Sequence, residues 1–228
     1  MTKLQEFTDF LKTVPLAEYR KKYAHVKIVE MDLPKDIQAI ELLYTVYWDE
    51  KQFLTFEEFY KRYLKEKYDL ADTFRKKTTM CEDCFSRGLE ARIYRTWAGL
   101  ITQIHAGYVA EDVFGEGTVS MSAELDHQGA DIRVEYKGHF LNYQVKKTSY
   151  SGVKSSKPLP RKESLDGEAI DIFYEVPTCL SDPKTKKGEF RVPYLRFLED
   201  KRTEVFENGF VVFTKETFLP KKQEIDQN

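Results

Sequence analysis

The residues best suited to chemistry lie in the stretch 124–147, ELDHQGADIRVEYKGHFLNYQVKK. Two runs of alternating apolar and polar side chains flank Lys137-Gly138, which predicts two strands joined by a hairpin loop. With that loop, Asp131 lies opposite Gln144, and Lys146 is one diagonal step away. A carboxylate, an amide oxygen and an ammonium group would then share one patch. Such a patch is typical of a metal-dependent phosphodiesterase.

Phosphodiester hydrolysis needs an activated water, charge neutralisation at the phosphate and help for the leaving oxygen. Mg²⁺ held by one or two carboxylates supplies much of this, because it keeps several waters and accepts a phosphate oxygen. A neighbouring lysine stabilises the transition-state charge and orients the attacking water. The PD-(D/E)xK nucleases place an acid on one strand and an acid-x-lysine sequence on the next. Asp131 and Gln144-Val145-Lys146 resemble that arrangement.

Gln144 departs from the usual arrangement, which has an acid at that position. An amide oxygen binds a hard cation but adds no negative charge, so the patch needs another acid. Asp126, five residues before Asp131, is the nearest candidate. Its spacing fits two interpretations equally, because Asp126-His127-Gln128-Gly129 also has the residues of a type I turn. For Asp131 and Lys146, the alternative is a cross-strand surface ion pair.

The elements expected to position the hairpin form an α/β fold, a mixed sheet flanked by helices. Residues 1–80 are predicted to be a mostly helical region packed on the core, with helices at 37–48 and 56–68 and Thr55 as an N-cap. Residues 81–228 are predicted to be a nuclease core, within one compact domain overall. Strands are expected at 119–121, 169–176 and 210–213, and a disordered tail from about Lys221.

One further helix, expected to be capped by Ser86, carries apolar residues three and four positions apart and so has a face toward a core. That face is Leu89, Ile93, Trp97, Leu100, Ile104 and Tyr108. Glu90 lies near the start of this helix. An ion pair with neighbouring Arg92 or Arg95 is its expected role, and a place in a metal shell is the alternative.

Composition narrows the class of protein. The 228 residues have a formal net charge of −2, so any contact with nucleic acid requires a local basic patch. Three cysteines exclude a dense disulfide framework, and the lone pair Cys81 and Cys84 is expected to be ordinary buried thiols. No stretch has the apolar length of a signal peptide or of a membrane span. We therefore expect a cytoplasmic protein without a membrane partner.

Three segments in this order make the sequence similar to the TaqI family of type II restriction endonucleases, a branch of the PD-(D/E)xK nucleases. They are LAEYRKKYAHVKIVEMDLP, GLEARIYRTWAGLITQIHAGY and ELDHQGADIRV with YQVKK. The resemblance extends to about residue 160. It implies that Asp126, Asp131 and Lys146 are essential, which favours the ligand interpretation of Asp126. It also implies Mg²⁺-dependent cleavage of a short palindromic duplex site, TCGA in the best-known members, by a homodimer paired with a cognate DNA methyltransferase.

A basic segment follows the predicted catalytic strand. From Lys146 to Lys162 there are six basic residues and no acidic one. Such a segment suits contacts to DNA phosphates, and the alternative is a solvated loop. The predicted DNA-binding residues are Lys147, Ser149, Lys154, Ser155, Ser156, Lys157, Arg161 and Lys162.

Two other functions fit the same residues. One is a repair or recombination nuclease of this superfamily that recognises DNA structure rather than sequence. The other is a non-catalytic DNA-binding protein, in which Asp131 and Lys146 form only an ion pair. A DNA methyltransferase is not supported, because no glycine-rich cofactor loop follows a strand. The four histidines form no cluster of the HNH nuclease type.

Overall fold

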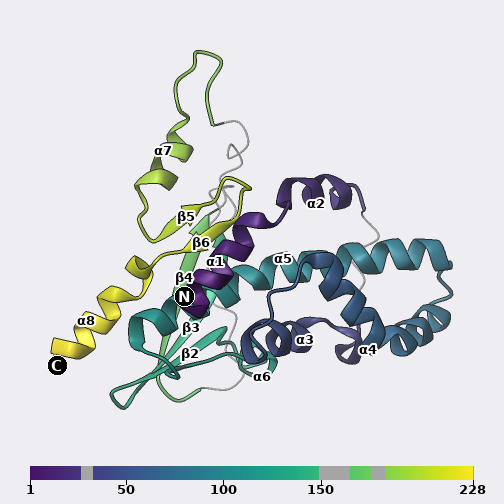
Figure 1. The fold of residues 1–228 in the computed structure, drawn as a ribbon, viewed down its shortest axis with the longest axis horizontal. Coiled ribbons are helices and arrows are strands. Elements are labelled where there is room, and N and C mark those ends of the chain that lie inside the picture. Colours follow the sequence, from purple (N-terminus) through teal and green to yellow (C-terminus); the bar gives the residue numbers. More distant parts are fainter. Residues whose placement is uncertain (27–32, 149–164, 176–182, 228) are drawn as a thin grey trace. The chain divides into compact units, whose positions relative to one another are not determined.

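A computed structural model describes residues 1–26, 33–148, 165–175 and 183–227 (Figure 1). Their contacts group the chain into two units: unit 1 is Met1–Lys12 with Thr102–Asn228, and unit 2 is Thr13–Ile101. Helix α5, Glu82–Phe114, contributes residues to both. The expected mixture of helices and a mixed sheet is confirmed. That residues 1–80 form a region of their own stays a prediction.

Helices dominate the N-terminal half of the chain and strands follow α5. The other α-helices are α1 Lys3–Thr13, α2 Leu16–Tyr23, α3 Ile40–Tyr44, α4 Phe56–Lys77, α6 Ala123–His127, α7 Val192–Glu199 and α8 Leu219–Gln227. Short 3-10 helices are η1 Lys35–Ile37 and η3 Lys215–Thr217, and η2 Thr45–Asp49 is a π-helix. The strands are β1 Val119–Ser120, β2 Ile132–Tyr136, β3 His139–Thr148, β4 Glu168–Glu175, β5 Thr203–Val205 and β6 Val211–Phe213. Among the described residues, no helix combines the length and apolar character needed to span a membrane.

Unit 2 is helical, as predicted for residues 1–80, and many of its buried side chains are aromatic. Thr55 caps α4 in a full capping box with Glu58, which confirms the predicted N-cap. Inside the unit, the buried indole of Trp97 donates a 2.7 Å hydrogen bond to the hydroxyl of Tyr47, which donates in turn to the carbonyl of Leu54. Apolar packing therefore surrounds a polar chain whose members are all paired.

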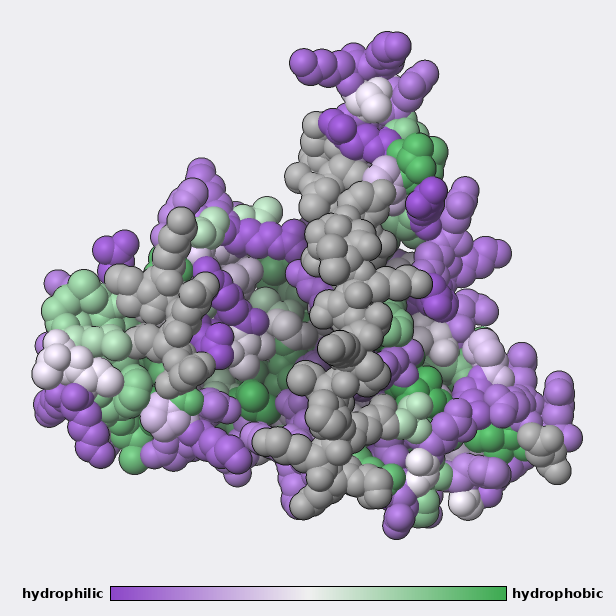
Figure 2. All heavy atoms as spheres, turned by 180° about the vertical axis from the view of Figure 1, so that it is seen from behind, coloured by the Kyte–Doolittle hydropathy of each residue, from purple (hydrophilic) through white to green (hydrophobic). Residues whose placement is uncertain are grey.

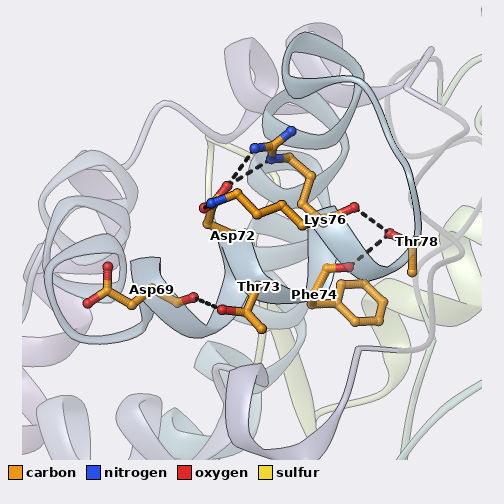
Figure 3. Close-up of polar contacts among 7 residues, drawn as sticks. Asp69, Asp72, Thr73, Phe74, Lys76 and Thr78 are labelled. Atoms are coloured by element: carbon orange, nitrogen blue, oxygen red, sulfur yellow. Dashed lines mark hydrogen bonds and ion pairs between the residues drawn. The ribbon is translucent and has the colours of Figure 1, made fainter.

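The C-terminal end of α4 is held by its own side chains (Figure 3). Asp72 accepts from Arg75 and Lys76, three and four residues further along the helix. The hydroxyls of Thr73 and Thr78 donate back to the carbonyls of Asp69 and Phe74. Each hydroxyl bonds the carbonyl four residues earlier, and the Phe74 carbonyl also accepts the backbone N–H of Thr78 at 3.0 Å.

Unit 1 contains a four-stranded sheet in the order β1-β2-β3-β4. β1, β2 and β3 are antiparallel, and β4 runs parallel to β3. The five residue pairs between β2 and β3 run from Ile132↔Tyr143 to Tyr136↔His139, which confirms the predicted hairpin register. Its loop is Lys137-Gly138, and both residues have positive φ (48° and 79°), as a type I′ turn requires.

The start of β4 is fixed by two contacts with β3. Gly167 has φ +110°, and a Cβ there would lie 2.2 Å from the carbonyl oxygen of Phe140, so a side chain cannot fit. Beside it, the amide of Asn142 donates to the carbonyl of Asp166 at 3.1 Å. Together they set the register between the two parallel strands.

Two expectations about the start of α5 are wrong. Helix α5 begins at Glu82 rather than near Ser86, because the sulfur of Cys81 accepts the backbone N–H of Cys84 at 3.2 Å and two acidic residues follow Cys81. Cys81 and Cys84 are accordingly exposed, not buried. Cys179 lies outside the described residues.

The C-terminal residues are also not a disordered tail. They form α8, in which Ile225 is buried. Lys221 pairs with Glu168 at 2.7 Å, and Asp226 accepts from Lys137 at 2.7 Å. These contacts with β4 and the hairpin loop hold the helix, whose own sequence has no strong apolar stripe.

Most exposed side chains are hydrophilic on the face seen in Figure 2, with scattered apolar ones. Four of the large apolar residues that remain exposed belong to α7 and the turn before it. They are Phe190, Val192, Leu195 and Leu198. Only Phe197 of α7 is buried, so this helix contributes little to the core of unit 1.

Replacing Tyr47 by Phe should lower the free energy of unfolding by about 1–3 kcal/mol, because the buried N–H of Trp97 loses its acceptor. Urea denaturation followed by tryptophan fluorescence measures this. Tyr68→Phe is the matched control, since its side chain is 56% exposed, and its effect should stay within about 0.5 kcal/mol. Equal effects of the two substitutions would show that the Trp97–Tyr47 bond does not stabilise unit 2.

Candidate active site

Asp131 lies where the hairpin ladder ends. Its backbone N–H donates to the carbonyl of Tyr143 at 2.9 Å, and its carboxylate Oδ2 accepts the N–H of Val145 at 2.6 Å. The side chain thus replaces a backbone carbonyl as the partner of β3. Asp131 is 4% exposed, so this contact fixes a buried carboxyl group against the backbone of β3 at Val145, between Gln144 and Lys146 in the sequence.

Asp126 reaches the same carboxyl group from the short helix α6. The hydroxyl of Ser122 caps that helix by accepting the N–H of Leu125 at 3.1 Å. The backbone carbonyl of Asp126 accepts from Gly129, whose φ of +90° turns the chain back toward β2. Its side chain is hydrogen-bonded to the carboxyl group of Asp131. The turn and ligand interpretations of Asp126 are therefore compatible, since its backbone carbonyl forms the turn and its side chain contacts Asp131.

The two carboxyl groups share a poorly solvated environment. Burial raises the pKa of Asp131 to about 7; the N–H of Val145 opposes this shift, and the nearby Asp126 adds to it. Burial also raises the pKa of Asp126, while its bond to Asp131 and nearby His127 lower it in part. Two facing carboxyl groups resist being ionised together, which favours one shared proton or a bound cation at this position.

Gln103, on α5, is a third contact of Asp131 that the sequence patterns did not reveal. Its side chain hydrogen-bonds the carboxyl group and lowers the pKa of Asp131. Its place beside Leu100 and Ile104, at the edge of the apolar face, was the available signal. A polar residue there can reach a buried group while the rest of the helix face packs.

Gln144 and Lys146 are half-buried on β3, on either side of Val145. The ammonium group of Lys146 lies 2.5 Å from the carboxylate of Asp171 on β4. Asp171, which is directly opposite Gln144 in the parallel register, was also missed. The signal was an acid alternating with Ile170 and Ile172 in the predicted strand 169–176.

Two of the remaining predicted site residues, Glu90 and Lys147, lie in the part of the chain that the structure describes. Glu90 belongs to unit 2, where its carboxylate accepts from the hydroxyl of Tyr23 at 2.6 Å and pairs with Lys22 at 2.7 Å. An ion pair is therefore present, with a lysine rather than with Arg92 or Arg95. Lys147 is exposed on β3. The other predicted DNA-binding residues, Ser149, Lys154, Ser155, Ser156, Lys157, Arg161 and Lys162, lie outside the described residues.

Comparison with known proteins gives a consistent result over nearly the whole chain. The family model described as TaqI restriction endonuclease matches residues 4–225. The chain belongs to the TaqI restriction endonuclease family. It is 34% identical over 224 residues to "Type II restriction enzyme TaqI" of Thermus aquaticus, and 30% identical over 228 residues to "Type II restriction enzyme TthHB8I" of Thermus thermophilus. Each alignment covers 92% of this chain and 83% of the relative. No solved structure matches the chain.

The site of this TaqI-family chain suits a hard divalent cation. Among the described residues, no group of three or more His, Cys, Asp or Glu side chains is placed to hold a metal. Asp126 and Asp131 nevertheless offer two carboxyl groups whose mutual repulsion a cation would relieve, and Asp131 bonds to the β3 residues on either side of Gln144. Mg²⁺ commonly takes one or two carboxylates and keeps waters at its other positions. The donor set therefore fits Mg²⁺ better than zinc, which prefers nitrogen and sulfur ligands.

Replacing Asp131 by Asn should flatten the pH dependence of stability in the metal-free protein. The pKa of Asp131 is raised above its unfolded value of about 3.9, so the folded state keeps a proton that the unfolded state has lost. The free energy of unfolding should therefore fall as pH rises from about 4 to about 7. Urea denaturation in chelator at pH 5 and pH 8 should show a larger fall for wild type than for the variant.

Glu135→Gln, an exposed substitution on β2, is the control and should keep the wild-type dependence on pH. Adding Mg²⁺ at pH 8 should raise the melting temperature of wild type and leave that of Asp131→Asn unchanged, because ligands of the ion must be ionised. Parallel pH curves, or equal Mg²⁺ effects in both proteins, would contradict this description of the site.

Proposed function

We propose that this protein is a type II restriction endonuclease that hydrolyses phosphodiester bonds of double-stranded DNA at a short palindromic site, with Mg²⁺ as cofactor. The observation that carries the proposal is the family match, because residues 4–225 include Asp126, Asp131 and Lys146. The printed names of both relatives are those of type II restriction enzymes. The clustering of the three residues at one end of the hairpin supports the same conclusion.

The chain's own residues have separate roles in this proposal. Asp126 and Asp131 would hold the ion, with Gln144 as a neutral ligand and Gln103 orienting Asp131. Bound Mg²⁺ supplies positive charge at the phosphate and lowers the pKa of a coordinated water. The proposed role of Lys146, which follows the Asp131-bonded Val145 on β3, is to stabilise charge on the phosphate and to orient the attacking water. The bond from Val145 to Asp131 keeps the distance between the Asp131 carboxyl group and the backbone of Lys146 constant, because Val145 directly precedes the lysine.

The proposal includes a PD-(D/E)xK type of fold. In support, the antiparallel hairpin β2–β3 carries the acid and the lysine, β4 joins it in parallel, and α5 precedes it. A place for Glu90 in a metal shell stays a prediction; its described partners are Tyr23 and Lys22. Lys147 and the basic segment up to Lys162 are proposed to contact DNA phosphates.

Further parts of the proposal rest on the family alone. They are a recognition site similar to TCGA, action as a homodimer in which each subunit cuts one strand, pairing with a cognate DNA methyltransferase, and a cytoplasmic location. A twofold symmetric enzyme matches a palindromic site because each half-site then meets identical residues. A repair nuclease or a non-catalytic DNA-binding protein remains the competing proposal.

Incubation with Mg²⁺ and plasmid DNA should give discrete fragments whose sequenced ends share one short palindrome. The expected cause is base-specific contact combined with the paired carboxylates at the phosphate. Cleavage at ends or branches, without a common sequence, would favour the repair nuclease. Salt-dependent DNA binding without cleavage, over a range of divalent metals, would favour a binding protein and overturn the proposal.

Replacing Lys146 by Ala should lower the cleavage rate by at least about 10²-fold, because charge developing on the phosphate loses its ammonium partner. Single-turnover cleavage with enzyme in excess measures this step. Lys137→Ala is the matched control, since Lys137 is an exposed lysine of the same hairpin that pairs with Asp226. Similar rates in the two variants would remove Lys146 from the catalytic group.

A further inference from the structure

Lys146, the lysine of the proposed active site, is held by residues of a strand that lies outside the hairpin. Its Nζ is 2.5 Å from Oδ2 of Asp171. The same Nζ lies 6.0 Å from the centre of the Phe173 ring, two residues further along β4. Since residues i and i+2 of a strand point to the same face, Asp171 and Phe173 together define where the ammonium group rests.

The register of β4 makes this arrangement specific. Asp171 pairs with Gln144 and Phe173 with Lys146, so an acid of β4 stands directly beside the position where the motif lacks one. Gly167 and the bond from Asn142 to Asp166 fix that register four residues earlier. A shift by one residue would move Asp171 to the other face of the sheet.

Stability alone is a weak reason for this ion pair. The side chains of Lys146 and Asp171 are 32% and 33% exposed, and partly exposed pairs typically contribute no more than about 1 kcal/mol. The same exposure leaves Lys146 accessible to a substrate. The pair therefore sets the direction of a reactive side chain at little energetic cost to the fold.

We propose that Asp171 is a positioning residue, which acts on the reaction by holding Lys146 in place. This inference rests on the proposed function. Asp171 supplies beside the lysine the negative charge that Gln144 does not, and it does so from β4 rather than from the lysine's own strand. It leaves the carboxyl pair Asp126 and Asp131 to hold the cation.

The test compares Asp171→Asn with wild type in single-turnover cleavage, with DNA bound before Mg²⁺ is added. The cleavage rate should fall about 10- to 100-fold, because a lysine without its partner samples other rotamers. DNA affinity without Mg²⁺ and the Mg²⁺ concentration for half-maximal rate should stay within about threefold of wild type. Asp171→Glu, which keeps the charge, should recover part of the rate.

Glu168→Gln is the matched control, because it breaks another ion pair of β4, with Lys221, outside the site. It should cut at the wild-type rate. A wild-type rate for Asp171→Asn would overturn the inference while leaving the proposed function intact. So would a tenfold higher Mg²⁺ requirement, which would make Asp171 a metal ligand, or an equal loss in Asp171→Glu. If wild type cuts no DNA, the proposed function fails and this inference fails with it.

Discussion

The site depends on one hydrogen bond, from the backbone N–H of Val145 to the carboxylate of Asp131. A strand that diverges from its neighbour leaves N–H groups without partners, and burying one without a partner costs free energy. Here the carboxylate is that partner, so the same contact that extends the pairing of β2 with β3 also fixes an acid against the backbone of β3 at Val145. Helix α6 and Gln103 then converge on the group that this bond has immobilised.

Two carboxylate environments result on either side of β3, and they differ in their electrostatics. Asp131 is buried against another acid, which favours a proton or a cation in place of one. Asp171 is partly exposed and already has an ammonium partner. A divalent cation held by Asp126 and Asp131, as proposed, would therefore not compete with Lys146 for Asp171. In the proposed reaction, this separation lets positive charge approach a phosphate from two directions.

The sequence predicted the parts of the molecule that depend on local spacing. Alternation around Lys137-Gly138 defined the hairpin and its register, and Thr55 with Glu58 marked the start of α4. Prediction from the sequence failed where contacts with residues far away in the chain determine the local structure. Helix α8 has a weak stripe and is held by Glu168 and Lys137, which lie far away in the chain. At the start of α5, the sulfur of Cys81 accepts a backbone N–H, although serine at position 86 is the commoner type of capping residue.

The same limit explains which site residues were missed. Asp131, Gln144 and Lys146 lie on two strands joined by a tight loop, so alternation and hairpin geometry relate them directly, whereas the family resemblance favoured Asp126 as a ligand. Gln103 and Asp171 reach the site from a helix and from a parallel strand, and a parallel pair needs a crossover whose register no spacing rule gives. Only the structure shows that Gly167, which admits the carbonyl of Phe140, places Asp171 opposite Gln144. The apparent deficit of charge at Gln144 is thus a property of the linear motif. In three dimensions, the neighbouring strand supplies an acid at that point.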